Sequence, residues 1–501
     1  MRRKIFFTIL LLIFSVFLFS EDVEKINLKV SLHKLKNGLT VIIAPIHDTP
    51  IIYSLIRYKV GSVNEHVGIT GISHMCEHMM FKGTKEIQTV NYQKEVPLMK
   101  KEDELFKKVI ELRKAKVRNC TPPDVDRKIK NLLLKIKGLE RSQKIYSVQN
   151  DIDVSTFSVG FSRLSADTSF DRTHYYEYFP SNCLEAWAYF ESSRMREPVF
   201  REFYSERNVV LEEYYQTTEN DPDGFLFGRF LASLIIAHPY HWDVIGWKSD
   251  IINYTREKVY NYHKKYYAPN NAIIVLVGDV YEDEALKLIK KYFGSIKPQK
   301  IEETVLTSEP PQRGEKRIVV RFNASPRLMM GFHKCQANSE DQPVFDVIEY
   351  LLSHGRSSIL YKNLIGSGKA SYFYLSQGDM KRYPGIFYVY SMPNEGVSLK
   401  EIEGIVWNSF NSLKHINISN RELLKAKKGI IGNLYYTASD KENLAVMLAE
   451  YYDIYGDVNY YEKYIKEINK ITKEDIRRVA RKYFVRDNCA IAYLLRPGEK
   501  E

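Results

Sequence analysis

The sequence predicts an α+β protein made of two related halves, and three observations support this prediction. The segment Thr255 to Gly278 has the pattern of a helix running into a strand, and Thr472 to Leu495 repeats it without gaps. Such self-similarity indicates an internal duplication. Each half also opens with apolar, β-rich segments and continues with helices. Pro310, Pro311 and Gly314 mark a linker between the halves.

The N-terminus has the composition of a secretory signal peptide, predicted at residues 1–20. Basic residues at positions 2–4 precede an apolar run from Ile5 to Phe19. The alternative is an uncleaved N-terminal anchor, because no Ala-x-Ala cleavage site is visible. No other run is apolar and long enough to span a bilayer. We therefore expect an exported bacterial chain, periplasmic or secreted, without stable membrane insertion after cleavage.

The domain boundaries follow from these features in chain order. The predicted units are a first domain at 26–301 with β-rich segments at 39–52 and 53–60, a linker at 302–315, and a second domain at 316–501 with a β-rich segment at 318–332. We expect the two domains to face each other, each with a sheet packed against helices.

Residues 92–148 interrupt the first domain with a polar, Lys- and Glu-rich insertion. Its apolar residues follow helical spacing in two runs. The runs are Leu98, Leu105 and Leu112, then Ile129, Leu132, Leu133, Ile136 and Leu139. Because Pro122 and Pro123 separate the runs, we expect an antiparallel helical hairpin.

The net charge of +11 does not by itself indicate a nucleic-acid partner. The basic residues are spread along the chain, and no Lys/Arg cluster interleaved with aromatic residues occurs in the mature part. We expect no nucleic-acid binding. The five cysteines are scattered and show no disulfide framework.

The segment His74-Met75-Cys76-Glu77-His78 carries the strongest chemical signal. It reads H-x-x-E-H, the reversed form of a zinc-protease helix signature. Residues four apart lie on one helix face, so both imidazoles can converge on one ion. Glu77 is then placed to act as a general base on a water bound to that ion. The alternative is a pair of helix histidines satisfied by packing.

A catalytic zinc site usually takes three protein ligands, so a third is expected elsewhere. Glu206 and Glu213 are seven residues apart and lie on nearly the same helix face. One could bind the metal while the other supports a ligating histidine. Spacing alone does not assign the two roles, and a solvated acidic helix face is the alternative.

In the second half, the segment 344–360 takes the place of the motif helix and offers only His354, which predicts an inactive domain.

The sequence resembles the pitrilysin-like, or inverzincin, M16-type metallopeptidases, a family that includes insulin-degrading enzyme and the mitochondrial processing peptidase. The resemblance covers essentially the whole mature chain. It rests on Gly61-Ser62, the segment Gly68 to Gly71, the motif with Met80 to Thr84, the helix from Glu206 to Glu213, His238-Pro239-Tyr240, Val244 to Gly246, Tyr266 to Asn271, Gly355 to Ser358, and Leu360-Tyr361. The resemblance implies that one zinc ion is bound by His74, His78 and Glu213, with Glu77 as general base and Glu206 supporting a ligand.

The resemblance also implies a substrate-binding edge strand and two stabilising residues. Ser165 and Ala166 occupy the place where the family usually carries an Asn-Ala pair and where a peptide adds as an extra strand. Ser165 is a departure, because it replaces the asparagine. Arg382 and Tyr388 are the candidates for steadying the substrate carbonyl, and packing in an aromatic-rich strand is the alternative.

These inferences predict a zinc-dependent endopeptidase that hydrolyses short or unfolded peptides. One alternative is a subunit of a hetero-oligomeric peptidase, since chains of this family often work in pairs. Another is a non-catalytic interaction or assembly member of the same family. The expected partners are a peptide substrate and, for a paired enzyme, a second copy or a related subunit.

Overall fold

The computed structural model describes residues 28–118, 124–148, 160–302, 305–415 and 418–499. The predicted signal peptide and the proline pair Pro122-Pro123 lie outside the described residues. No helix within the described ranges is long and apolar enough to cross a membrane.

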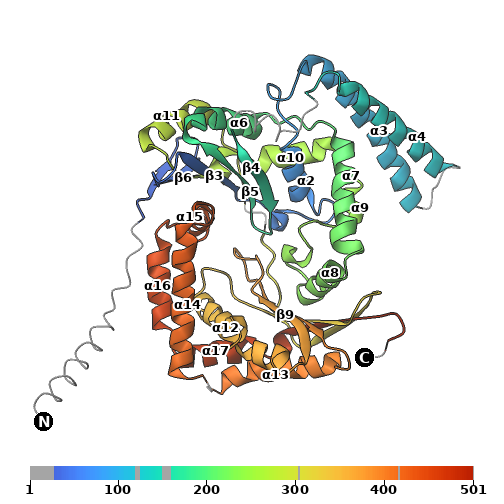
Figure 1. Cartoon of the computed structure of the whole chain (residues 1–501). Coiled ribbons are helices and arrows are strands. Elements are labelled where there is room, and N and C mark those ends of the chain that lie inside the picture. Colours follow the sequence, from blue (N-terminus) through green and yellow to red (C-terminus); the bar gives the residue numbers. More distant parts are fainter. Residues whose placement is uncertain (1–27, 119–123, 149–159, 303–304, 416–417, 500–501) are drawn as a thin grey trace, which may run out of the picture.

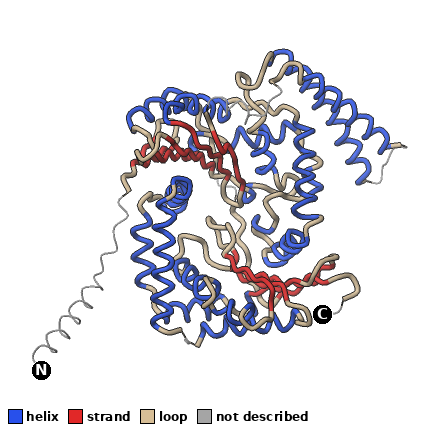
Figure 2. Tube along the Cα trace, in the orientation of Figure 1, coloured by secondary structure: helices blue, strands red, loops and turns tan. Residues whose placement is uncertain are grey.

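Two mixed sheets form the centre of the two halves (Figures 1 and 2). The first sheet has the strand order β1-β2-β6-β3-β5-β4 and the second β7-β11-β8-β10-β9. The first sheet consists of β1 (Ser31–Lys34), β2 (Thr40–Pro45), β3 (Ile51–Tyr58), β4 (Ser162–Thr168), β5 (Thr173–Pro180) and β6 (Ala272–Gly278). The second sheet consists of β7 (Lys316–Arg321), β8 (Arg327–His333), β9 (Ala370–Ser376), β10 (Ile386–Pro393) and β11 (Cys489–Leu495).

The two sheets share one topology, which confirms the predicted duplication of an α+β unit. Strand β2 pairs with β6 in parallel, and β7 pairs with β11 in parallel. All the other pairings that the two sheets share are antiparallel. The first sheet differs by one added edge strand, β1, which pairs with β2. The strands β4 and β9 therefore hold equivalent edge positions.

The helices follow the same order in the two halves. The first half contains α2 (Ile72–Met79), α3 (Tyr92–Val117), α4 (Val125–Gln143), α6 (Leu184–Arg196), α7 (Phe203–Tyr214), α8 (Pro222–Leu234), α9 (Lys248–Ile251), α10 (Arg256–Tyr266) and α11 (Glu282–Phe293). The second contains α12 (Gln342–Ser353), α13 (Leu399–Lys414), α14 (Asn420–Ser439), α15 (Lys441–Tyr455), α16 (Tyr460–Lys470) and α17 (Lys473–Tyr483). By order along the chain, α12 corresponds to α2, α14 to α7, and α15 to α8.

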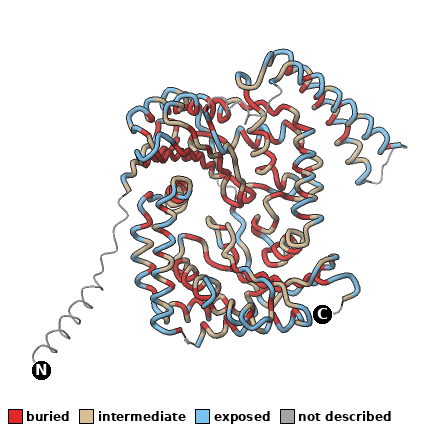
Figure 3. The backbone as a smooth tube through the Cα atoms, in the orientation of Figure 1, coloured by how far each residue is buried: buried red, intermediate tan, exposed pale blue. Residues whose placement is uncertain are grey.

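Each half covers the sheet of the other half with one helix. Helix α15 packs on β3 and β6 of the first sheet, where Leu444 and Leu448 meet Leu55 and Val275 in one buried cluster. Helix α8 packs on β7, β8 and β11 of the second sheet. Both sheets are consequently buried on these faces (Figure 3). The halves are therefore joined by two apolar interfaces and not only by the linker.

Buried charges add to this junction. Arg57 on β3 pairs with Asp453 on α15 at 2.9 Å, and each of these side chains is only 2% exposed. Arg382 of the second half contacts the same carboxylate at 3.3 Å. Asp171 of the first half accepts hydrogen bonds from the backbone N–H groups of Lys381 and Arg382 at 2.8 and 3.0 Å.

The insertion forms the predicted helical hairpin, with α3 and α4 packed along each other and extending away from the body of the first half (Figure 1). Its base is anchored by buried acidic residues of α3. Glu95 pairs with Arg201 at 2.8 Å, and Glu102 pairs with Arg256 at 2.6 Å. Some of the charged residues of the insertion therefore attach the hairpin to the body of the first half.

Candidate metal centre

Helix α2 begins at a position where only glycine fits. Gly71 has a φ of 86°, and a Cβ atom there would lie 2.2 Å from the carbonyl oxygen of Ile245. Because glycine has no side chain to cap the helix, Glu65 takes that role. Its buried carboxylate accepts hydrogen bonds from the backbone N–H groups of Gly71 at 2.6 Å and Ser73 at 2.9 Å. These contacts fix the start of the motif helix.

The motif helix is also held along its length. Met75, Cys76 and Met79 are buried in the core of the first half, so Cys76 packs on a different face from the histidines. The Ser73 hydroxyl lies 2.7 Å from the hydroxyl of Tyr262 on α10. The opposite face of α2, which carries His74 and His78, is left facing α7.

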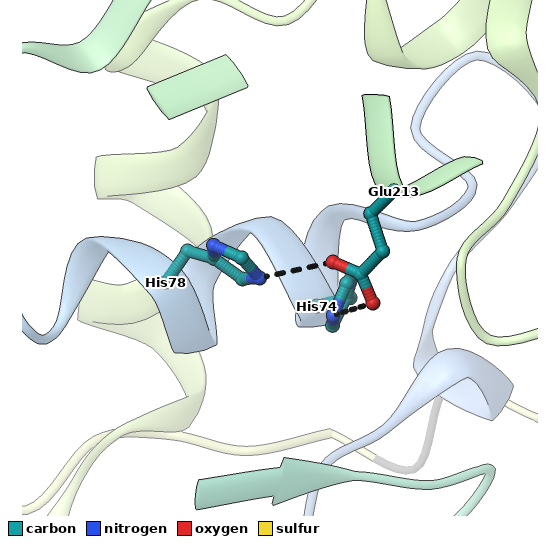
Figure 4. Close-up of side chains that lie close together, drawn as sticks. All are labelled: His74, His78 and Glu213. Carbon is teal, nitrogen blue, oxygen red and sulfur yellow. Dashed lines mark ion pairs between the residues drawn. The ribbon is translucent and has the colours of Figure 1, made fainter. Parts of the chain in front are cut away.

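The structure brings together His74, His78 and Glu213 (Figure 4). Within the described ranges they form a trio whose candidate ligand atoms all lie within 4.8 Å of one another. The Nε2 atoms of His74 and His78 lie 3.6 and 3.4 Å from different oxygens of the Glu213 carboxylate. Two imidazole nitrogens and one carboxylate oxygen therefore converge on one point.

Glu206 lies seven residues before Glu213 on nearly the same face of α7 and makes a different contact. Its carboxylate lies 2.9 Å from Nδ1 of His78, the ring nitrogen that points away from Glu213. Its other oxygen pairs with Lys82 at 2.6 Å. A carboxylate at this nitrogen fixes the ring orientation and, in the neutral imidazole, keeps the proton on Nδ1, so that Nε2 can present its lone pair to a metal ion. The contacts therefore distinguish Glu206 from Glu213, which spacing alone did not.

Glu77 lies on α2 between the histidines and touches the edge strand. Its carboxylate accepts a hydrogen bond from the hydroxyl of Thr168, the last residue of β4. Strand β4 pairs only with β5 among the described strands, so its other edge carries no strand. The candidate general base is therefore held beside an open sheet edge.

Burial and neighbouring charges shift the pKa values of these groups. Burial raises the pKa of Glu77 to about 7, against the opposing hydrogen bond from Thr168. Burial lowers the pKa of His74 to about 4. Burial also acts to lower the pKa of His78, but its contacts with Glu206 and Glu213 outweigh this effect and raise the pKa to about 9.

The donor set fits a zinc ion. Two histidines and one carboxylate are ligands that zinc commonly takes in catalytic sites. Nδ1 of His74 is buried and has no hydrogen-bond partner among the described residues, which leaves this ring without a competing contact. The three residues would hold the ion through both Nε2 atoms and the Glu213 carboxylate.

The other predicted site residues lie on strands β4 and β10 and in the loop before β10. Ser165 and Ala166 lie within β4, paired with β5 opposite Tyr176 and Tyr175. The contacts of Arg382 and Tyr388 lead elsewhere: Arg382 pairs with Asp453, and Tyr388 packs against Phe227 and Phe230 of α8. Their roles in substrate binding stay predictions.

Sequence reasoning missed three residues that position this centre: Glu65, Lys82 and Thr168. Thr168 lies far from the motif in sequence, so no spacing pattern connects it with Glu77. Lys82 lies four residues after His78, beyond the end of α2, and helical spacing therefore gave no reason to pair it with Glu206. Glu65 caps a helix across a loop.

Comparisons with known proteins agree with this architecture. A family model described as Insulinase (Peptidase family M16) matches residues 41–100, and one described as Peptidase M16 inactive domain matches residues 253–430. The zinc protease PqqE of Helicobacter pylori is 27% identical over 469 residues, covering 92% of each chain. The uncharacterized zinc protease ML0855 of Mycobacterium leprae is 25% identical over 289 residues, covering 55% of this chain and 62% of the relative.

Solved structures show the same fold. A protease from Helicobacter pylori matches with a TM-score of 0.76 and 26% identity, covering 93% of this chain and 100% of that one. The first half of the periplasmic protease PqqL from Escherichia coli has the same fold, with a TM-score of 0.65, 16% identity, and coverage of 94% and 92%. The duplicated fold and its matches define a two-domain protein with the M16 peptidase fold. The chain belongs to the pitrilysin-like M16 peptidase family.

Removing the carboxylate charge of Glu206 tests its supporting role. We expect Glu206→Gln to weaken zinc binding by about 10- to 100-fold, because supporting hydrogen bonds to metal-ligating histidines have effects of that size. Competition for zinc with a chromophoric chelator measures the change. An unchanged zinc affinity would show that the His78 contact does not support the metal.

Proposed function

We propose that this protein is an exported, zinc-dependent endopeptidase that acts on short or unfolded peptides. The observation that carries the proposal is the convergence of His74, His78 and Glu213 beside Glu77 and an open sheet edge. The similarity to proteins named zinc proteases supports it. Zinc held by the trio would polarise a scissile carbonyl and lower the pKa of a water molecule.

The remaining steps belong to the chain's own residues. The open edge of β4 pairs with the backbone of an extended peptide, which selects unfolded segments. Glu77, fixed by the Thr168 hydroxyl, takes a proton from the attacking water and delivers it to the leaving amine. Glu206 keeps His78 oriented throughout. Ser165 and Ala166 lie on the pairing strand, where backbone hydrogen bonds need no particular side chain.

A second candidate is a catalytic subunit that works with a copy of itself or a related chain. Two contacts favour this candidate: Arg382 pairs with Asp453, and Tyr388 packs on α8. In these positions the two side chains do not stabilise the substrate carbonyl, so a partner chain would have to supply that group. Activity of the purified chain alone, against activity only after a related subunit is added, separates the two candidates.

The metal requirement is tested by removing one ligand. We expect the purified chain to hold one zinc ion and to cleave an unstructured peptide, and Glu213→Gln to lose both the zinc and the cleavage. Glu212→Gln is the matched control, because Glu212 is exposed on the same helix. Metal analysis and mass spectrometry of the peptide products give the two readouts. Full zinc content in Glu213→Gln would overturn the ligand assignment.

A further inference from the structure

The second half contains a polar cavity of about 660 Å³ between α12, α14, α15, α16 and the end of β9. This volume lies within the range of small-molecule sites. In the first half, the corresponding elements α2, α7 and β4 build the candidate metal centre. The cavity therefore occupies the place that the duplication assigns to a second centre.

The register of α12 on α2 shows which residues replaced the motif. Buried residues on the two helices follow the same pattern: Ile72, Ser73, Met75 and Cys76 on α2, and Val344, Phe345, Val347 and Ile348 on α12. The positions of His74, Glu77 and His78 are accordingly taken by Asp346, Glu349 and Tyr350. Only the glutamate is retained.

The retained glutamate also keeps its type of contact with the edge strand. Glu77 accepts a hydrogen bond from Thr168 at the end of β4, and Glu349 accepts one from Gln377, the residue after β9, at 2.7 Å. One oxygen of Glu349 is occupied in this way. The other accepts no hydrogen bond from the described residues.

The charged groups around the cavity are three carboxylates and two lysine ammonium groups. Lys381 is neutralised by Glu450, whose two oxygens each lie 2.8 Å from its ammonium nitrogen. Asp346 accepts hydrogen bonds from Gln377 at 2.7 Å and from other neighbours. Lys334 donates to amide oxygens at 2.6 and 2.8 Å and makes no direct ion pair within the described ranges. The lining therefore carries an excess of one negative charge when its carboxylates are ionised.

Tyrosines of α15 and α16 also line the cavity. Tyr455 stacks on Tyr460 with ring centroids 3.6 Å apart, and Tyr451 lies 5.4 Å from Tyr460. Tyr464 continues the row and donates its hydroxyl to Asp346. Aromatic faces beside a carboxylate attract organic cations through the ring quadrupole.

We propose that this cavity binds a small molecule that carries a primary ammonium or guanidinium group. Glu349 is the counter-ion through its open oxygen, and the tyrosines Tyr451 and Tyr455 contact the alkyl part and the cation. The second half would thus carry an organic-cation site at the place where the first half carries the metal-binding motif. It is independent of zinc and of peptide cleavage.

Calorimetric titration of the purified full chain tests the proposal. The probes are cadaverine for the ammonium group and agmatine for the guanidinium group, with 1,5-pentanediol as the neutral control of equal length. We expect saturable binding of at least one cation and none of the diol. Glu349→Gln is expected to weaken that binding about tenfold or more, because a charge-assisted hydrogen bond is lost.

Three further variants separate the role of the Tyr451 ring from that of its hydroxyl, and this site from the metal centre. Tyr451→Ala is expected to weaken binding, whereas Tyr451→Phe keeps the ring and should bind within a few-fold of the parent. Glu213→Gln should bind as the parent does. Equal binding of the diol, no saturation by either cation at millimolar concentration, or unchanged affinity in both Glu349→Gln and Tyr451→Ala would overturn the proposal.

Discussion

Replacing Glu77 by glutamine is expected to lower kcat/KM for an unstructured peptide by about 10³-fold or more, because the general base is lost. Zinc content should stay at the parent level, since the trio of His74, His78 and Glu213 is intact. The glutamine amide oxygen can still accept the hydrogen bond from Thr168, so the local packing is preserved.

Peptide cleavage and zinc content should be measured on the same preparation of Glu77→Gln. The combination of full zinc and lost cleavage separates a proton-transfer role from a ligand role. Thr168→Val serves as the companion variant, because it removes only the group that positions Glu77, and we expect a smaller loss. Cleavage by Glu77→Gln at the parent rate would contradict the mechanism.

The sequence predicts the local parts of the site well, because they depend on helical spacing. His74 and His78 are four residues apart on one helix, and the structure places their Nε2 atoms on the same side. The roles of Glu206 and Glu213 could not be assigned from spacing, since both lie on one face of α7. The assignment depends on how α7 crosses α2, which is a tertiary contact.

The duplication was predictable from the repeat, but the exchange of covering helices was not. An amphipathic pattern shows that one face of α8 or α15 is buried, and it does not show which sheet buries that face. The cavity of the second half was missed for a related reason. The segment 344–360 lacks the histidines of the motif, and only the register of α12 reveals that Glu349 holds the place of Glu77.

The largest stability effect is expected at the buried ion pair between the halves. Arg57 and Asp453 are each 2% exposed in their side chains, and Arg382 contacts the same carboxylate. Asp453→Asn leaves the buried Arg57 guanidinium without its direct ion-pair partner. Breaking a buried pair in this way typically costs about 3–5 kcal/mol in the free energy of unfolding.

A second ion pair across the same junction provides the control. Lys441 on α15 pairs with Asp48 at 2.6 Å, but the Asp48 side chain is 61% exposed. Exposed pairs contribute only about 0–1 kcal/mol, so Asp48→Asn should leave the urea midpoint nearly unchanged. Both variants remove one carboxylate charge from the junction, so a difference between them reports burial. Because α8 and α15 join both sheets in shared cores, we expect one cooperative transition in each case. A midpoint for Asp453→Asn equal to that of Asp48→Asn would mean that the apolar faces of α8 and α15 alone hold the halves together.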